Sequence, residues 1–315
     1  MSGGRRELRL GLGGLALVAA ACVAGPALLP EPPPADPAHA ALLPPLARVT
    51  VLELADGRTV VTPVAVWGPD GWTVRRGAGT ERIPASLVVS RRGHRFWLGT
   101  DTLGRDLLSR LLRGGRVSLA VAGASLLVSL AVGFGVGLAA ASGPRWLDAV
   151  AMRLVDAWMA FPALFLLILL AAVFQPGTAA LVAILGATSW MGLARLVRGQ
   201  ALSVRERPFV LASRAAGSPW WLRWGLHLVP NVAGPAAQEA ALRMGDLVIA
   251  EATLSFLGLG VQPPTPSWGA LAAEGRAVLL GGWWLAALPG LAVALTVILL
   301  AVAGDGLQRR LAAAG

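Results

Sequence analysis

Residues Val117–Ala141 read VSLAVAGASLLVSLAVGFGVGLAAA, a continuous apolar run without a charged side chain. A helix needs roughly 20 apolar residues to cross the hydrocarbon core of a bilayer, so this run is long enough for one membrane span. Further runs of this kind are Leu10–Leu29, Ala157–Phe174, Thr178–Ala194 and Trp283–Ala303. The repetition of such runs predicts an all-α membrane protein that crosses the bilayer several times.

The composition of the chain supports the same class. Of its 315 residues, 56% are hydrophobic and only 14% are charged, which is typical of a polytopic membrane protein rather than a soluble domain. All 27 basic residues are arginine. They do not form one patch, so nucleic acid is not predicted as a partner. Because a phosphate-binding P-loop requires a lysine, any ATP that drives this protein must be hydrolysed by another chain.

A sixth span, Val229–Leu254, is predicted despite its ionisable residues, which hydropathy alone would penalise. Loop charge supports it. With six spans and a cytoplasmic N-terminus, the arginines of both termini and of the cytoplasmic loops fall inside, and the short outside loops hold only Arg276, which satisfies the positive-inside rule. We therefore predict six transmembrane helices with both termini in the cytoplasm.

The first span has an alternative interpretation as a cleaved secretory or lipoprotein signal. Arginines precede the apolar run, and Ala19-Ala20-Ala21-Cys22 resembles a processing site. A lipoprotein signal usually has a larger aliphatic residue at the position of Ala19. Both interpretations place the following segment outside the cytoplasm.

Residues 31–98 form that segment, and their pattern predicts a proline-rich linker followed by β-structure. Val49–Leu54 alternates in the manner of a strand. Ala55–Arg58 and Gly68–Gly71 are turn signals. We expect two hairpins and a further strand near Leu87–Ser90, in a small extracytoplasmic subdomain that is either a structural cap or a docking site for a substrate-delivery protein.

An arginine-rich insert, Arg195–Pro230, separates two of the predicted spans. Apolar residues recur at helical spacing before Gly217-Ser218-Pro219, and tryptophans restart the pattern after it. The insert therefore predicts two short helices joined at Gly217. It is longer than a simple connection requires, so our leading hypothesis is a docking surface for a soluble partner. The alternative is a pair of amphipathic helices at the membrane surface.

Motifs of catalysis and metal binding are not found in the sequence. No Gly-x-Ser-x-Gly or His-Glu-x-x-His pattern occurs, and His39, His94 and His227 are far apart. The lone Cys22 is interpreted as a packing residue. We predict no catalytic residue, no metal site and no cofactor bound by this chain.

Several motifs together give the chain a family resemblance. It resembles the C-type permease subunit of the dipeptide, oligopeptide and nickel importers, which are binding-protein-dependent ABC transporters. The resemblance covers about residues 95–310, and residues 31–98 are an insertion relative to shorter members. The matching motifs are Gly99-Thr100-Asp101-x-x-Gly104-Arg105-Asp106-x-x-Ser109-Arg110, Arg195–Gln200, Phe209-Val210-Leu211-Ala212-Ser213-x-x-x-Gly217, Val229-Pro230-Asn231, Leu254–Gln262, Pro266-Ser267-Trp268-Gly269 and Gly304–Leu307.

The resemblance implies a function and a set of partners. The chain is expected in the bacterial cytoplasmic (inner) membrane with a homologous second permease, two cytoplasmic ABC ATPase subunits and an extracytoplasmic solute-binding protein. Di- or oligopeptides are the expected cargo. Alternatives are nickel or another small solute, a secondary transporter, and, in a different class, a membrane-anchored enzyme or assembly factor. The implied organisation is a first span in 1–30, the insertion in 31–98 and a permease domain in 99–310.

The resemblance also implies which residues couple the chain to an ATPase. A coupling helix is expected at the turn of the insert, with glycine permitting close backbone approach. Two positions depart from the family motif: its glutamate is Leu211 here and its second alanine is Ser213. Without the family, Gly217 has the simpler interpretation of a helix stop. The expected coupling residues are Ala212, Ser213, Ala215, Ala216, Gly217, Ser218, Pro219 and Pro230.

Glu239, Arg243 and Asp246 lie on one helical face of the sixth predicted span, because they are spaced by four and three residues. Ionisable residues at membrane depth are costly and usually face a bundle interior or a water-filled path. One interpretation is that this face lines the translocation pathway. The other is a structural ion pair between Glu239 and Arg243.

Two further features have purely structural interpretations. Pro162 is expected to kink the Ala157–Phe174 span. The segment Gly99–Arg110 is expected to form an interfacial helix capped by Asp101.

Overall fold

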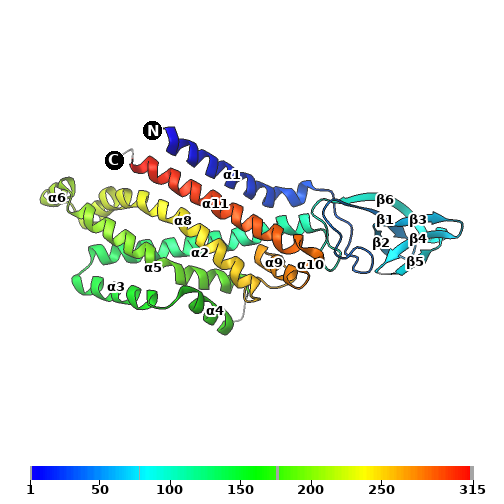
Figure 1. The fold of residues 1–315 in the computed structure, drawn as a ribbon. Helices are drawn as coiled ribbons and strands as arrows, with labels where there is room; N and C mark the ends of the chain where they lie inside the picture. Colours follow the sequence, from blue (N-terminus) through cyan, green and yellow to red (C-terminus); the bar gives the residue numbers. More distant parts are fainter. Residues whose placement is uncertain (1, 78, 175–176, 313–315) are drawn as a thin grey trace. The chain divides into compact units, whose positions relative to one another are not determined.

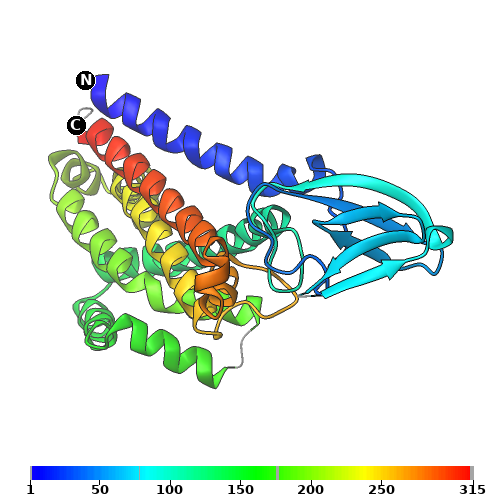
Figure 2. The ribbon, with the colours of Figure 1, turned by 45° about the vertical axis from the view of Figure 1, so that its right-hand side comes forward.

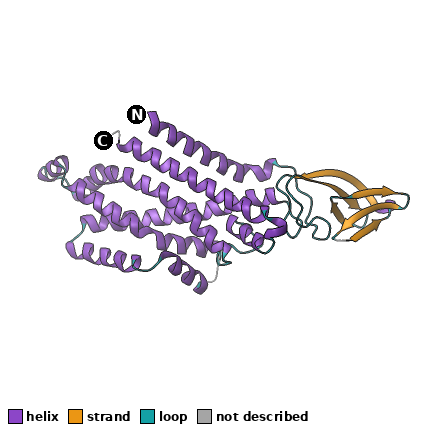
Figure 3. Cartoon of the chain, in the orientation of Figure 1, coloured by secondary structure: helices purple, strands orange, loops and turns teal. Residues whose placement is uncertain are grey.

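The fold is that of a computed structural model, which describes residues 2–77, 79–174 and 177–312. Helices predominate, and the strands lie between residues 47 and 96 (Figure 3). The chain divides into two compact units. The first comprises residues 1–18, 118–262 and 293–315, and the second comprises 19–117 and 263–292. Each unit is described by itself.

The first unit is built from helices. Within it, α5 packs against α8, and α3 and α4 pack against α5, as both ribbon views show (Figures 1 and 2). Three of its helices, α1, α2 and α11, also contribute residues to the second unit. The bounds are α1 Ser2–Leu28, α2 Leu107–Ser142, α3 Arg145–Met159, α4 Ala163–Val173, α5 Thr178–Arg205, α6 Pro208–Ala215, α7 Trp220–Arg223, a π-helical turn Trp224–Leu228, α8 Val229–Phe256 and α11 Trp284–Ala312.

Four of the described helices, α1, α2, α5 and α11, are each long and apolar enough to cross a membrane. They correspond to four of the apolar runs expected from the sequence, within one residue at the ends. The fifth run, Ala157–Phe174, is not one helix: α3 and α4 meet at an angle of 87° and count together as one broken span. Proline disfavours helical geometry at the residue before it and has no N–H to donate, so the break falls at Phe161 and Pro162.

Close glycine contacts hold the ends of the chain together in the first unit. A Cβ on Gly11 would lie 2.6 Å from the Ala303 backbone nitrogen, and one on Gly306 would lie 2.4 Å from that of Leu8. The numbering runs in opposite directions along the two helices, so α1 and α11 are antiparallel here. Glu7 and Arg309 form an ion pair at 2.6 Å. The first and last turns of the chain therefore lie at the same end of this unit (Figure 1).

The second unit contains two small antiparallel sheets. Their strand orders are β2-β1-β6 and β3-β4-β5. Both predicted hairpins are present, with turns at Ala55–Arg58 and Gly68–Gly71. Sequence reasoning missed β5, and the strand expected near Leu87–Ser90 extends to Phe96. The bounds are β1 Ala47–Leu54, β2 Thr59–Thr62, β3 Ala65–Gly68, β4 Gly71–Arg76, β5 Gly79–Ile83 and β6 Val88–Phe96, with a 3-10 turn Ala85–Leu87 and short helices α9 Trp268–Arg276 and α10 Leu279–Gly282.

A buried carboxylate ties the proline-rich linker to these strands. Asp36 accepts a hydrogen bond from the Val61 backbone N–H at 2.8 Å, and His39 Nδ1 lies 2.9 Å from the same carboxylate. The linker segment is thus attached to β2 through side-chain contacts that its composition alone does not reveal.

The expected interfacial helix with Asp101 as its cap is wrong. The segment before α2 is a turn, and α2 begins at Leu107, where Asp106 accepts the Ser109 N–H at 3.0 Å. Asp101 is fully buried and pairs with Arg105 and Arg110, each at 2.6 Å. Glu274 of α9 completes the cluster with a 2.5 Å contact to Arg110. Charge pairing rather than helix capping explains this motif.

Gly104 lies in the same turn and allows a test of the fold. Its φ is +73°, and a Cβ would lie 2.4 Å from the Asp36 carbonyl oxygen. Gly57 has a φ of +82° but open space around it. We expect Gly104→Ala to cost about 2 kcal/mol more than Gly57→Ala, because both introduce left-handed strain and only the first adds a backbone clash. Thermal unfolding of the detergent-solubilised protein measures the difference; equal losses contradict the packing described.

Candidate coupling surface and polar helix face

The insert expected at Arg195–Pro230 begins as helix rather than loop. α5 continues to Arg205, so the irregular part of the insert starts at Glu206. The first two arginines are held by acidic residues of α3: Arg195 lies 2.5 Å from Asp156, and Arg198 Nη2 donates to Asp148 at 2.6 Å. These arginines attach α3 to α5 and are not part of the exposed surface that follows.

The expected pair of short helices joined at Gly217 is present as α6 and α7. Gly217 has a φ of +77°, and its N–H donates to the Arg214 carbonyl at 3.1 Å. The Ser218 N–H donates to the Ser213 carbonyl at 3.2 Å. A Cβ at Gly217 would meet nothing within 4 Å. Backbone conformation, not crowding, therefore requires glycine here.

Most of the expected coupling residues lie on an exposed surface. Ser213 and Ser218 are half-buried, and the exposed members are Ala212, Ala215, Ala216, Gly217, Pro219 and Pro230. The structure thus brings the helix pair and its turn together as one exposed element.

Pro230 does not break the chain into separate helices, because α7, the π-helical turn and α8 follow one another without a gap. Proline has no N–H for the helical ladder. The wider π turn precedes it, and the Asn231 side-chain amide donates to the His227 carbonyl at 2.7 Å. The Val229-Pro230-Asn231 motif therefore marks the transition from the exposed surface into the long helix α8.

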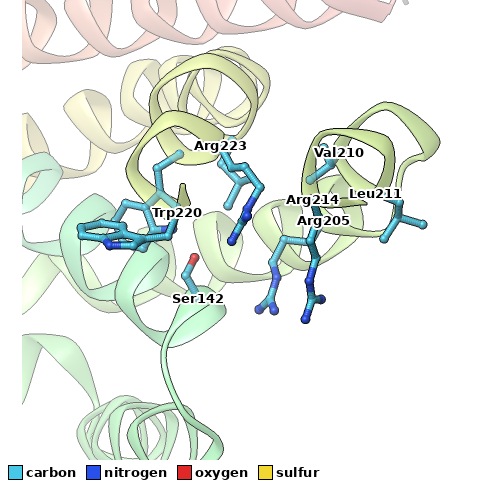
Figure 4. A pocket seen from close by; sticks show the side chains of 9 residues that line it. Ser142, Arg205, Val210, Leu211, Arg214, Trp220 and Arg223 are labelled. Atoms are coloured by element: carbon cyan, nitrogen blue, oxygen red, sulfur yellow. The ribbon is translucent and has the colours of Figure 1, made fainter. Parts of the chain in front are cut away.

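A hollow of ≈ 260 Å³ lies beside this element (Figure 4). Three arginines from three successive elements line it: Arg205 ends α5, Arg214 lies in α6 and Arg223 ends α7. We call it the arginine pocket. Its remaining lining residues are Ser142, Val210, Leu211, Trp220, Trp224 and Leu228. Sequence reasoning noted the arginines but could not show that they converge.

The polar face of α8 contains the ion pair between Glu239 and Arg243 that their four-residue spacing makes possible. Arg243 Nε donates to Glu239 Oε1 at 2.9 Å, and both side chains are about one quarter exposed, at 28% and 24%. Gly192 of α5 makes room for the guanidinium, since a Cβ there would lie 2.0 Å from Arg243 Nη2. Asp246 and Arg243 both line a cavity of ≈ 330 Å³ between α4, α5 and α8. Arg243 also lines a second cavity, of ≈ 340 Å³.

Glu251 is a buried carboxyl group to which the sequence interpretation gave no role. It accepts a hydrogen bond from Ser255 Oγ at 2.7 Å, and Ser255 Oγ also accepts the Val261 N–H at 3.2 Å. A Cβ on Gly260 would lie 2.1 Å from Ser255 Oγ. The Leu254–Gln262 motif is thus a tightly packed turn that returns onto the end of α8.

Metal binding finds no support in the part of the chain that is described. Within residues 2–77, 79–174 and 177–312, no group of three or more His, Cys, Asp or Glu side chains is placed to hold a metal ion.

Comparison with known proteins identifies the family. Residues 131–314 match the family described as "Binding-protein-dependent transport system inner membrane component". The chain belongs to this family. Its members are permease components of ABC importers, so this permease is not an enzyme and is an inner membrane component that works with ATPase and substrate-binding components.

Individual relatives agree with this assignment. The di/tripeptide transport system permease protein DppC of Pseudomonas aeruginosa is 39% identical over 214 residues, which cover 68% of this chain and 71% of the relative. The oligopeptide transport system permease protein OppC of Haemophilus influenzae is 38% identical over 223 residues, 71% of each chain. Among solved structures, an inward-facing MetNI methionine ABC transporter chain has a TM-score of 0.50 at 19% identity, covering 62% of this permease and 93% of that chain. The last likeness concerns the fold alone.

The Glu239–Arg243 pair gives a stability prediction. Arg243→Gln leaves Glu239 without its cation in a partly buried place, so we expect a loss of about 1–2 kcal/mol in the free energy of unfolding. The double variant Glu239→Gln/Arg243→Gln removes both charges and should recover most of that loss. Unfolding of the three proteins in detergent tests the coupling; a double variant as unstable as Arg243→Gln contradicts it.

Proposed function

We propose that this permease forms one half of the translocation pathway of an ATP-driven importer of di- or oligopeptides. The observation that carries the proposal is the exposed α6–Gly217–α7 element, which is anchored at both ends by the long helices α5 and α8. A rigidly anchored, exposed helix pair is suited to transmit movement from a soluble partner to a helical bundle. The names of the relatives, which refer to peptides, motivate the choice of cargo.

We propose six transmembrane spans with both termini in the cytoplasm. Four helices and the broken pair α3–α4 supply up to five spans, and α8 is the sixth. The antiparallel contact of α1 with α11 supports an even number, because a chain whose ends lie on the same side crosses the bilayer an even number of times. The charges of α8 explain why hydropathy does not select it; they face other helices or cavities, where intramembrane charges are tolerated.

The six-span topology also gives each remaining segment of the chain a place relative to the membrane. Residues 1–30 contain the first span, 31–98 form an extracytoplasmic linker and β-structured insertion, and 99–310 form the permease domain. The α6–α7 element then faces the cytoplasm. We propose that the assembly contains a homologous second permease, two ABC ATPase subunits and an extracytoplasmic solute-binding protein, and that the chain itself holds no cofactor.

The coupling surface is proposed to consist of residues that the structure leaves mostly exposed around Gly217. Closure of the ATPase dimer would move α6 and α7, and the continuous path from α7 through the π-helical turn into α8 would carry that movement into the bundle. Alternating access then follows from rigid-body motion of helices. The proposed coupling residues are Ala212, Ser213, Ala215, Ala216, Gly217, Ser218, Pro219 and Pro230.

The polar face of α8 is proposed to line the pathway. Arg243 and Asp246 border the cavity between α4, α5 and α8, and Glu239 neutralises Arg243 on one side. A face with both signs of charge suits a zwitterionic peptide, whose two termini need opposite partners. A role in the pathway is compatible with the Glu239–Arg243 ion pair, because Glu239 can hold the guanidinium of Arg243 in position beside the cavity.

Gly217 tests the coupling role. Gly217→Val should abolish most ATP-dependent uptake because a β-branched residue resists a φ of +77°. Gly217→Asn should retain most uptake because asparagine tolerates this conformation. Uptake of a labelled tripeptide is measured in proteoliposomes that contain the whole transporter and its binding protein, with ATP hydrolysis measured in parallel. Normal uptake by Gly217→Val contradicts the coupling role.

The α8 face is tested with the same assay. The charge-free double variant Glu239→Gln/Arg243→Gln is expected to insert and fold normally, yet to import the tripeptide roughly tenfold more slowly, because it lacks charged partners along the path. Import at the unmodified rate would assign this pair a structural role only. Import of Ni²⁺ in place of the tripeptide by the unmodified transporter would contradict the proposed cargo.

A further inference from the structure

The arginine pocket gathers three positive charges around one hollow. Arg205, Arg214 and Arg223 come from three elements, and their side chains point toward the same open space (Figure 4). Within the described residues, none of the three forms an ion pair with an acidic side chain. Like charges gathered around one hollow repel one another, and arginine stays charged. The arrangement is therefore suited to bind an anion.

The backbone holds two of these arginines in place. Arg205 Nη1 donates to the Ala141 carbonyl, and Arg223 Nη1 donates to the Ser218 carbonyl. Carbonyl oxygens orient a guanidinium but leave its charge uncompensated. Each of these side chains retains further N–H groups, because a guanidinium has five donors in a planar fork. The pocket is thus preorganised to bind an acceptor.

A fourth donor in the pocket is also unused. Ser142 ends α2 and lines the hollow, and its Oγ is buried without a hydrogen-bond partner in the described structure. A buried hydroxyl normally has a partner, so an unsatisfied one requires an explanation. A carboxylate among the arginines would supply acceptor atoms for Ser142 as well. Two independent observations, the arginines without an acidic partner and the unused hydroxyl, favour an anionic partner at this pocket.

Leu211 shows that this chain does not supply the group itself. It lines the pocket and is 50% exposed, at the position where the family motif has glutamate. A glutamate there would place a carboxylate beside the arginines. With leucine in its place, the rim is apolar, and Trp220, 63% exposed, adds an aromatic surface. Exposed aromatic and arginine side chains around a pocket are typical of strong protein contacts.

We infer that the arginine pocket receives an acidic side chain, aspartate or glutamate, from the cytoplasmic ATPase subunit. The inference rests on the proposed function and adds the chemistry of the contact: the permease is the basic partner and the ATPase the acidic one. The hollow suits one such side chain, because Val210 and Leu228 offer apolar walls for its methylene groups and the arginines and Ser142 surround its carboxylate. A lipid phosphate is the other anion at a membrane surface; the ATPase is favoured because the pocket lies on the α6–α7 element that is proposed to contact it.

The test uses whole transporter extracted from native membranes, with this chain tagged and the recovered ATPase quantified. Leu211→Glu supplies an internal carboxylate that competes with that of the ATPase, so recovery should fall about tenfold. Leu211→Gln is isosteric with Leu211→Glu but uncharged, so it measures the loss of the apolar rim alone and should reduce recovery much less than Leu211→Glu does. Arg214→Glu should also lose about tenfold, whereas Arg207→Glu, the same charge change at an exposed arginine outside the pocket, should change recovery little.

The outcomes separate the inference from the proposed function. If the unmodified chain recovers no ATPase, the proposed function fails. If it recovers the ATPase but Leu211→Glu matches Leu211→Gln, or Arg207→Glu loses as much as Arg214→Glu, the inference is overturned and the proposed function stands. Unchanged ATPase recovery from Arg214→Glu, with loss of co-purified anionic phospholipid, also overturns it by making lipid the occupant.

Discussion

A guanidinium group keeps its charge at every physiological pH, and in this lysine-free chain arginine carries all of the basic charge. Each arginine near an apolar bundle therefore needs an anion or water, and the pairing of arginines organises much of the molecule. Two pairs attach α3 to α5, one lies along α8, and one joins the antiparallel ends of α1 and α11. In the second unit, Asp101 and Glu274 share Arg110. The arginine pocket is informative because three arginines converge there and, among the described residues, none has such a partner.

Glycine supplies the second constraint, since helices and turns approach closely where a side chain is missing. α1 meets α11 at Gly11 and Gly306, the guanidinium of Arg243 fits against Gly192, and Gly260 allows the turn after α8 to close on Ser255. Such contacts are typical of helix association in membranes, where close packing replaces the hydrophobic driving force. The family motifs at the C-terminus and after α8 thus describe packing rather than chemistry. Gly217 differs, because its surroundings are open and only its backbone conformation requires glycine.

Much of this architecture follows from sequence patterns because the signals are local. Apolar length predicts α1, α2, α5 and α11, the turn residues predict both hairpins, and the Gly-Ser-Pro break predicts the α6–α7 pair. The expected kink at Pro162 is present as the break between α3 and α4. What failed depends on side-chain contacts that the local pattern does not show: Asp101 binds arginines instead of capping a helix. β5 has a polar composition and is recognisable only through its pairing with β4.

The features of the candidate site likewise divide into those that local sequence patterns predict and those that depend on the three-dimensional structure. The spacing of Glu239 and Arg243 predicted a shared face, and the ion pair is present, whereas the cavities beside it require the positions of α4 and α5. Convergence of Arg205, Arg214 and Arg223 depends on the bend at Gly217 and on the end of α2, which no local pattern encodes. Arg195 and Arg198 belong to the same basic stretch of sequence, yet they pair with acidic residues of α3, Arg195 at the surface and Arg198 half-buried.

An importer of this kind requires the α6–α7 element to contact an ATPase from the cytoplasmic side. Photo-crosslinking in native membranes detects that contact, with a photoreactive amino acid at exposed Ala212 and, as the control, at exposed Thr80 of β5. We expect position 212 to form an adduct with an ABC ATPase subunit, identified by mass spectrometry, and position 80 to form none. Adducts at position 212 with lipid alone, or an ATPase adduct at position 80, would contradict the proposed contact.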